Sequence, residues 1–311
     1  MCGIGGWIGH MDGGARIADN MRQALHHRGP DSHGIKALSS ALLVHTRLSI
    51  IDLTEFGAQP IANETGTVWT VFNGEIYNHR ELRSDLEGKG HQFKGHSDSE
   101  TIPHLYEEFG VGFVDRLRGM FAIAIYDTRS RTLLLVRDRF GIKPLFYAAT
   151  KSSLVFASEL RALLHVPGID KRPDRQAVYD YASLFYIPAP ETFYRGIRAL
   201  QAGEMLQATL RGNEILWETR QHWNGVIAPD QHLSMSEAVD KGEALIAAAV
   251  RRQPGAVAPA QPPEQRYRQQ GARRAEPDIA GGIGRHDGSS EDAHAPKRLC
   301  HQPSDVPWHR S

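Results

Sequence analysis

The cysteine at the second position is the feature that most constrains how this chain can be organised. Cys2 directly follows Met1, so removal of the initiator methionine would place a thiol and a free α-amino group on one residue. Because the α-amino group has a reference pKa of about 7.7 to 8, it can accept the thiol proton near neutral pH, directly or through a water molecule. Cys2 would then be a nucleophile that carries its own base. The alternative is that Cys2 is an ordinary residue of a small apolar strand.

Composition and charge exclude several classes of partner. Lys plus Arg and Asp plus Glu both total 36, so we expect no nucleic acid and no anionic membrane as a main partner. The apolar run at residues 121–126 is far shorter than the roughly 20 residues that span a bilayer, and we expect no leader segment before Cys2. A cysteine that acts at position 2 therefore predicts a cytoplasmic enzyme. We expect no disulfide between Cys2 and Cys300, because nothing indicates an oxidising compartment.

Residue patterns indicate a layered α+β domain rather than a parallel array of alternating strands and helices. Apolar residues at helical spacing, such as Ile17, Met21 and Leu25, predict helices, and clusters of β-branched and aromatic residues predict strands. The predicted strands cover residues 3–9, 40–45, 67–72, 120–126, 132–137, 144–149, 154–157, 204–210 and 215–218. The four strands between residues 120 and 157 are so closely spaced that we expect a simple meander.

An Asn-Gly pair stands at the end of the third predicted strand. Asn73 and Gly74 would by default form a hairpin turn. However, Asn78 and Glu81 fit a helix capping box, so we expect a corner that leads from a strand into a helix. The paired histidines at residues 26–27 have no further ligand at metal-binding spacing. No metal site is therefore predicted.

Several separated motifs together resemble one enzyme family. They are CGI at residues 2–4, RGPD at 28–31, FNGEIYN at 72–78, SDSE at 97–100, RDRFGIKPLFY at 137–147 and ASEL at 157–160. In this order and spacing they resemble the class II glutamine amidotransferase domain of bacterial glutamine-hydrolysing asparagine synthetases. The resemblance extends from residue 1 to about residue 250, and any one of these motifs alone would be weak evidence.

The resemblance implies a fold and a mechanism. The implied fold is an N-terminal-nucleophile (Ntn) hydrolase, a four-layer αββα sandwich with two antiparallel sheets and the nucleophile at the start of the first strand. Cys2 would attack the side-chain amide of L-glutamine and form a γ-glutamyl thioester that water cleaves. The Asn73 side chain and the Gly74 backbone N–H would stabilise the oxyanion. The glutamine step would need no cofactor.

The resemblance also implies how glutamine is recognised. Arg47 would bind the α-carboxylate in a bidentate fork, and Asp98 would accept from the α-ammonium group with help from Glu75. For Asp98 an ordinary alternative exists, because the sequence around it also makes a good helix N-cap. Lys143 and Arg139 are expected to be exposed and available to a partner domain.

The C-terminal part departs from the family pattern. In asparagine synthetases an ATP- and Mg-dependent synthetase domain with a Ser-Gly-Gly-x-Asp-Ser loop follows the linking helix. Here Ser234 and Glu237 form a capping box for such a helix, but no such loop follows. Residues 253–311 contain no phenylalanine and many prolines, so we expect this segment to be disordered. We interpret it as a frameshifted or degenerate tail.

These observations predict three segments and one activity. Residues 1–220 would form the glutaminase domain, residues 221–252 a linker and helix, and residues 253–311 the tail. The predicted partners are L-glutamine, a synthetase domain or separate synthetase chain, and a second copy of the chain in a homodimer. Two alternatives remain open: an inactive truncated remnant, and a glutaminase component that serves a different acceptor through a separate synthetase chain.

Overall fold

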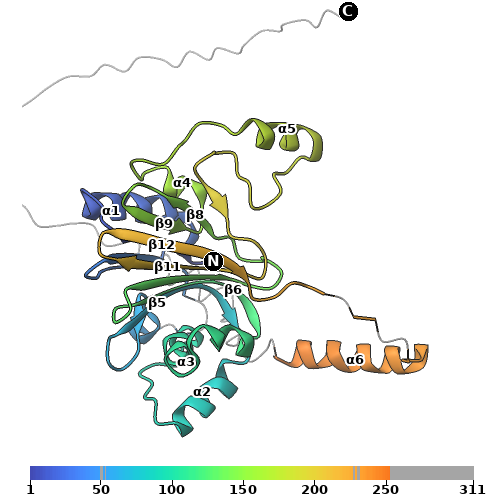
Figure 1. Ribbon diagram of the computed structural model, residues 1–311. Coiled ribbons are helices and arrows are strands. Elements are labelled where there is room, and N and C mark those ends of the chain that lie inside the picture. Colours follow the sequence, from blue (N-terminus) through green and yellow to red (C-terminus); the bar gives the residue numbers. More distant parts are fainter. Residues whose placement is uncertain (50–51, 53, 227, 230–231, 253–311) are drawn as a thin grey trace, which may run out of the picture. The chain divides into compact units, whose positions relative to one another are not determined.

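Two antiparallel sheets lie face to face between two layers of helices (Figure 1). The computed structural model describes residues 1–49, 52, 54–226, 228–229 and 232–252, and the predicted tail at residues 253–311 lies outside the described residues. Every pair of neighbouring strands in the two sheets is antiparallel. The αββα sandwich expected from the sequence is therefore confirmed.

The first sheet is built around the N-terminal strand. Its order is β10 (Arg198–Ala199), β8 (Phe146–Ala149), β9 (Ser153–Ala157), β1 (Gly3–Gly9), β3 (Ala41–Arg47) and β2 (Ser32–Ala37). β1 is a central strand that pairs with both β3 and β9. Its glycines let neighbouring backbone approach closely: a Cβ on Gly6 would lie 2.1 Å from the Leu42 carbonyl oxygen. This tight packing fixes β1, which begins directly after Cys2.

The second sheet faces the first. Its order is β12 (Glu214–Gln221), β11 (Glu204–Arg211), β7 (Thr132–Arg137), β6 (Gly119–Asp127), β5 (Val68–Ile76) and β4 (Ile61–Ala62). β5 and β6 pair along nine residues each, from Val68 opposite Asp127 to Ile76 opposite Gly119. This long register fixes the end of β5, which carries the Asn-Gly pair.

Three apolar layers bury the faces of the sheets, as a sandwich of this kind requires. Side chains such as Ile4, Leu43 and Phe156 fill the space between the two sheets. The outer face of the first sheet packs on α1 (Gly14–Leu25) and α4 (Leu160–Leu163). The outer face of the second sheet packs on α2 (His79–Gly88), α3 (Thr101–Phe109) and the 3-10 turn Gly110–Arg116. The predicted stripe on α1 is confirmed, since its members are buried.

The predicted meander is wrong, because β6 and β7 belong to the second sheet whereas β8 and β9 belong to the first. The cause is a turn organised by Asp138, whose buried carboxylate accepts from the backbone N–H groups of Phe121, Phe140, Ile142 and Lys143. These contacts turn the chain out of one sheet and toward the other. They also bury Lys143, so the expectation that Lys143 is exposed is wrong, whereas Arg139 is exposed.

The predicted corner at Asn73 and Gly74 is also wrong. Both residues lie inside β5, opposite Ala122 and Phe121 of β6, because cross-strand pairing continues past the Asn-Gly pair. The predicted capping box after it does not form: Asn78 precedes α2 but makes no side-chain cap. Its amide instead donates to the Arg116 carbonyl at 2.9 Å and accepts from the Arg118 N–H at 2.9 Å.

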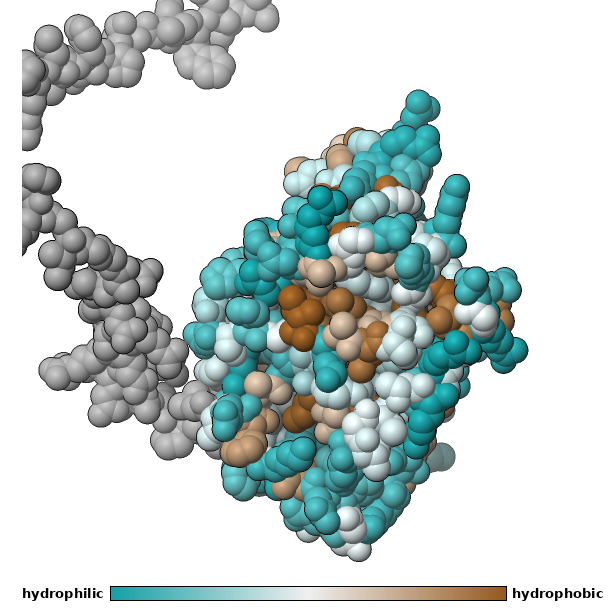
Figure 2. Space-filling view, turned by 90° about the vertical axis from the view of Figure 1, so that its left-hand side faces the viewer, coloured by the Kyte–Doolittle hydropathy of each residue, from teal (hydrophilic) through white to brown (hydrophobic). Residues whose placement is uncertain are grey.

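The helices α5 (Arg175–Leu184) and α6 (Met235–Arg252) expose apolar side chains. The capping box of α6 is confirmed, because the Glu237 N–H donates to Ser234 Oγ and Ser234 N–H donates to the Glu237 carboxylate. Figure 2 shows apolar surface gathered in patches among hydrophilic residues. Among the described residues, no helix is both long and apolar enough to cross a membrane.

Candidate active site

A cavity of about 200 Å³ opens beside the start of β1. All six residues that the sequence singled out contribute to its lining: Cys2, Arg47, Asn73, Gly74, Glu75 and Asp98. They come from the start of β1, the end of β3, the end of β5 and the 3-10 turn Asp98–Glu100. The two sheets and this turn therefore bring together residues that are almost a hundred positions apart in the chain.

Contacts of both the side chain and the backbone hold Cys2 at the cavity. Its thiol donates to the Leu48 carbonyl oxygen at 3.8 Å, and its own carbonyl accepts from Arg28 Nε at 3.0 Å. Arg28 is fixed in turn by Glu159, with 2.9 Å between Nη1 and Oε1. Burial raises the pKa of the Cys2 thiol. The thiol is therefore protonated at neutral pH and needs a base nearby to become a nucleophile.

Arg47 presents its positive charge to the cavity from the end of β3. Its Nη1 donates to the Thr54 carbonyl at 2.9 Å and its Nη2 donates to the Asp52 carbonyl. These hydrogen-bond partners are neutral carbonyl groups that hold the guanidinium in place, and the Asp52 carboxylate also interacts with its charge. Gly57 leaves room for it, since a Cβ there would lie 2.3 Å from Nη2. The fork is thus oriented and available to an anion.

Asn73 and Gly74 lie side by side near the end of β5. The Asn73 side chain is 1% exposed, and its Nδ2 has no hydrogen-bond partner among the described residues. Buried amide donors are rarely left without a partner, so this donor stands out in a residue that lines the cavity. Gly74 is required by the sheet itself, because a Cβ there would lie 2.1 Å from the Met120 carbonyl oxygen.

Two carboxyl groups, those of Asp98 and Glu75, belong to residues that line the cavity. Asp98 is 3% exposed, and its Oδ2 accepts from the Ile76 N–H at 2.9 Å. Burial raises the pKa of Asp98 to about 6, and the negative charge of Glu75 adds to this shift. Burial also raises the pKa of Glu75. The N-cap of the 3-10 turn is Ser97, which accepts from the Ser99 N–H, so Asp98 is not needed for capping.

The cavity also contains residues to which the sequence analysis gave no role in it. Lys143 lines it and places Nζ 3.4 Å from Met1 Sδ. Gln59 accepts from the Phe72 N–H at 2.6 Å and so fixes β5 next to Asn73. The carboxylate of Asp52 accepts from the Thr54 N–H and hydroxyl at 2.8 and 2.6 Å. The sequence signal for Lys143 was its place in the motif at residues 137–147; Gln59 and Asp52 carried none.

The family comparison points to one group of proteins. The model of the glutamine amidotransferase domain matches residues 1–223. Asparagine synthetase [glutamine-hydrolyzing] 2 of Bacillus subtilis is 39% identical over 72% of this chain and 31% of its own length. Asparagine synthetase [glutamine-hydrolyzing] 3 of the same organism is 35% identical over 81% of this chain and 41% of its own. The protein of the same name from Arabidopsis thaliana is 46% identical over 52% and 28%. The chain therefore spans well under half the length of these relatives.

Solved structures give the same fold. The glutamine phosphoribosylpyrophosphate amidotransferase of B. subtilis superimposes with a TM-score of 0.52 at 20% identity, over 70% of this chain and 49% of that one. A structure described as the allosteric regulatory enzyme of purine biosynthesis gives 0.53 at 21% identity, over 70% and 48%. At this identity the likeness concerns the fold alone. With the domain match over residues 1–223, it follows that this chain belongs to the glutamine amidotransferase family.

Proposed function

We propose that this chain hydrolyses L-glutamine to L-glutamate and ammonia through a thioester on Cys2. The observation that carries the proposal is the convergence of Cys2, Arg47, Asn73 and Asp98 on one cavity. A nucleophile, a free amide donor, a fixed cation and a buried carboxyl group are the parts that amide hydrolysis of a free amino acid requires. Family membership supports the same activity.

The first step depends on removal of Met1. The free amino group then belongs to Cys2 and lies beside its own thiol, where it takes the thiol proton, directly or through water. The thiolate attacks the carbonyl carbon of the glutamine side chain. The resulting tetrahedral intermediate collapses as the amino group returns the proton to the leaving nitrogen, which departs as ammonia. Water then cleaves the thioester, releases glutamate and restores the thiol.

The oxyanion of both tetrahedral intermediates needs donors that are fixed in advance. Asn73 Nδ2 supplies one, because it is buried in the cavity wall without a protein partner among the described residues. The Gly74 backbone N–H supplies the second. The sheet already holds both in position, so little reorganisation is needed when charge develops.

The charged groups of the cavity would select a free amino acid. Arg47 binds the α-carboxylate, and Asp98 with Glu75 binds the α-ammonium group. Burial makes the ionised form of Asp98 unfavourable. Binding of the α-ammonium group would offset part of this cost, because a cation next to a buried carboxylate favours its ionised form. The side-chain amide is then directed toward Cys2.

The glutaminase activity proposed here does not itself use the ammonia that it releases. The relatives are named asparagine synthetases, and the remainder of their length is the natural place for a synthetase domain. We propose that a synthetase domain or separate chain with its own ATP and Mg sites uses the ammonia, while the glutamine step needs no cofactor. Such a pairing would take place in the cytoplasm.

The test is release of glutamate and ammonia from glutamine by the purified chain and by Cys2→Ala. The proposal predicts equal amounts of the two products from the wild type and none above background from the variant. Release that persists in Cys2→Ala would exclude the mechanism. A wild-type chain that has lost Met1, is folded by circular dichroism and still releases neither product would identify an inactive remnant.

A further inference from the structure

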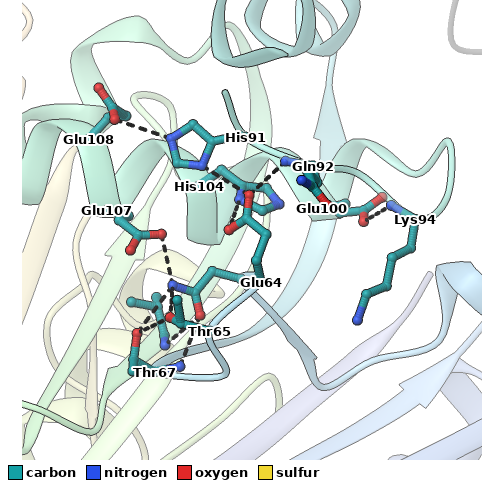
Figure 3. A network of polar contacts seen from close by, with 12 residues as sticks. Glu64, Thr65, Thr67, His91, Gln92, Lys94, Glu100, His104, Glu107 and Glu108 are labelled. Atoms are coloured by element: carbon teal, nitrogen blue, oxygen red, sulfur yellow. Dashed lines mark hydrogen bonds and ion pairs between the residues drawn. The ribbon is translucent and has the colours of Figure 1, made fainter. Parts of the chain in front are cut away.

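A second cluster of polar side chains lies on the outer face of the second sheet, away from Cys2. Glu64 stands in the turn between β4 and β5, His91 follows α2, and His104 and Glu107 lie one turn apart on α3. Figure 3 shows these side chains pointing toward one another from three segments of the chain. One ligand atom from each of the four residues lies within 4.8 Å of all the others.

Glu64 is the centre of the cluster because its carboxylate meets both histidines. Its Oε1 lies 3.2 Å from His91 Nδ1, and its Oε2 lies 3.2 Å from His104 Nδ1. The two imidazole rings are 5.0 Å apart between centroids. In a tetrahedral zinc site with ligand distances of about 2.0–2.2 Å, neighbouring ligand atoms are about 3.4 Å apart. The Glu64 contacts already have this spacing.

His104 is the residue that most needs a further partner. Its side chain is 1% exposed, and neither ring nitrogen makes a well-directed hydrogen bond within the described part of the chain. The 3.2 Å contact to Glu64 does not have hydrogen-bond geometry. A buried imidazole that lacks a directed partner and faces carboxylates is suited to hold a cation.

Neighbouring groups already orient the cluster as the outer partners of a metal site do. Asn63 Nδ2 donates to Glu107 Oε2 at 2.8 Å. The Gln92 N–H donates to Glu64 Oε1 at 2.7 Å. His91 Nε2 lies 3.2 Å from Glu108 Oε1, so the carboxylate of Glu108 can fix the tautomer in which Nδ1 of His91 is free to ligate.

We propose that Glu64, His91, His104 and Glu107 form a binding site for a divalent transition-metal ion, with Zn²⁺ as the best match. Two imidazole nitrogens and carboxylate oxygens are ligands that zinc accepts, and the two carboxylates balance its charge. Binding draws Glu107 inward to close the fourth position. Glu64 is exposed at the rim of the cluster, which gives the ion access from solvent.

The metal would connect three segments of the chain, two of which flank the turn that carries Asp98. It joins the β4–β5 turn, the segment after α2 and the helix α3. Between the last two lies the turn with Asp98, which leads directly into α3. The carboxylate of Glu100 holds the same stretch by accepting from the Lys94 and Gly95 N–H groups at 2.6 and 3.0 Å. The role of the ion is therefore structural, in support of the glutamine pocket.

The experiment is a zinc titration of the untagged full-length chain by calorimetry, repeated with His91→Gln/His104→Gln and with Glu64→Gln. His10→Gln is the matched control, because His10 also contacts a carboxylate, Asp12 at 2.9 Å. We expect both cluster variants to lose one zinc site and the control to keep it. Loss of Glu64 alone should weaken binding by more than the about 10- to 100-fold that loss of an outer partner causes.

Co²⁺ substitution distinguishes this site from any that uses cysteine. The wild type should show the visible bands of four-coordinate Co²⁺ without the near-ultraviolet band of thiolate ligation, and the double variant should lose those bands. Equal zinc binding by the wild type and both cluster variants would overturn the proposal, as would a wild type that binds no zinc. Glu64→Gln keeps an acceptor for the Gln92 N–H, so it gives the answer even if the double variant fails to fold.

Discussion

Individual side chains around Cys2 are held by the backbone rather than by one another. Arg47 is fixed by two carbonyl groups, Asp98 by the Ile76 N–H, and Asn73 by its place in a strand. All three residues line the cavity. A site organised in this way tolerates loss of one functional group without collapse, which makes single substitutions informative.

Asn73→Ala tests the oxyanion donor. Its Nδ2 has no partner among the described residues, so the substitution removes no donated protein hydrogen bond and should change the unfolding midpoint little. Turnover of glutamine should fall about 100- to 1,000-fold, the usual effect of deleting one such donor. Steady-state kinetics and urea unfolding measure the two quantities. A decrease of less than about tenfold would contradict the proposal that Asn73 is an oxyanion donor.

Asp98 should make the stability of the protein depend on pH. Burial raises its pKa from the ordinary value of 3.8 to about 6, so between these values the folded state keeps a proton that the unfolded state has released. Stability then falls as pH rises through this window, and the full penalty for the buried charge is present above about pH 6. In Asp98→Asn this penalty is absent.

The measurement is urea unfolding of the wild type and Asp98→Asn from about pH 4 to pH 7. Relative to the variant, the wild type should become less stable as pH rises. A difference between the two proteins that stays constant with pH would contradict the assignment. At neutral pH the variant should also bind glutamine more weakly, because it lacks the charge for the α-ammonium group.

Gly74→Ala tests how closely β5 and β6 approach. The added Cβ would lie 2.1 Å from the Met120 carbonyl oxygen, so the strands must separate where the proposed oxyanion donors lie. We expect a loss of about 1–3 kcal/mol in unfolding free energy, together with lower activity. Gly88→Ala is the control, since nothing lies within 4 Å of its Cβ position. Equal stability of the two variants would show that the strands adapt.

At the level of elements, the link between β5 and α2 depends on Asn78. Its amide connects this link to the start of β6 through the Arg116 carbonyl and the Arg118 N–H. Asn78→Ala leaves both backbone groups without this partner and should cost about 1–3 kcal/mol. Asn78→Asp keeps the acceptor for Arg118 and should lose less, as urea unfolding can show. Equal losses in the two variants would mean that the contact to Arg116 alone matters.

Most helices and strands could be predicted from local patterns, but the way the strands pair and divide between the two sheets could not. The stripe of α1, the strand at Thr132–Arg137 and the cap of α6 are encoded by neighbouring residues, and the structure confirms them. The crossing between sheets after β7 depends on the contacts of Asp138 with residues up to 17 positions away. The continuation of β5 through Asn73 depends on its pairing with β6. Such tertiary contacts override local turn and capping preferences.

Some residues of the candidate site could be predicted from the sequence, and others could not. The motifs and the family resemblance that they carry led to Cys2, Arg47 and Asp98, and the structure places them at one cavity. The burial of Lys143 could not be predicted, because it results from the Asp138 turn. The sequence did not predict the cluster around Glu64 either. Its four residues come from three segments of the chain, and only His104 and Glu107 share a helix.

For the whole molecule, every described residue that lines the cavity lies between Met1 and Lys143. The relatives extend much further than this chain does, but the chemistry proposed for Cys2 uses none of that additional length. A chain that ends at Arg252 should therefore hydrolyse glutamine with unchanged kcat and KM. An activity lost on truncation and restored by adding the missing segment would show that the segment contributes to the site.

The most direct test of the account is a covalent label at Cys2. The full-length chain is treated with a glutamine-like diazo ketone, and intact mass and peptide mapping locate the product, with excess glutamine as competitor. We predict a chain without Met1 that carries one label on Cys2, protected by glutamine and absent in Cys2→Ala. A chain that retains Met1 and takes up no label, or a label that persists in Cys2→Ala, would contradict the central claim.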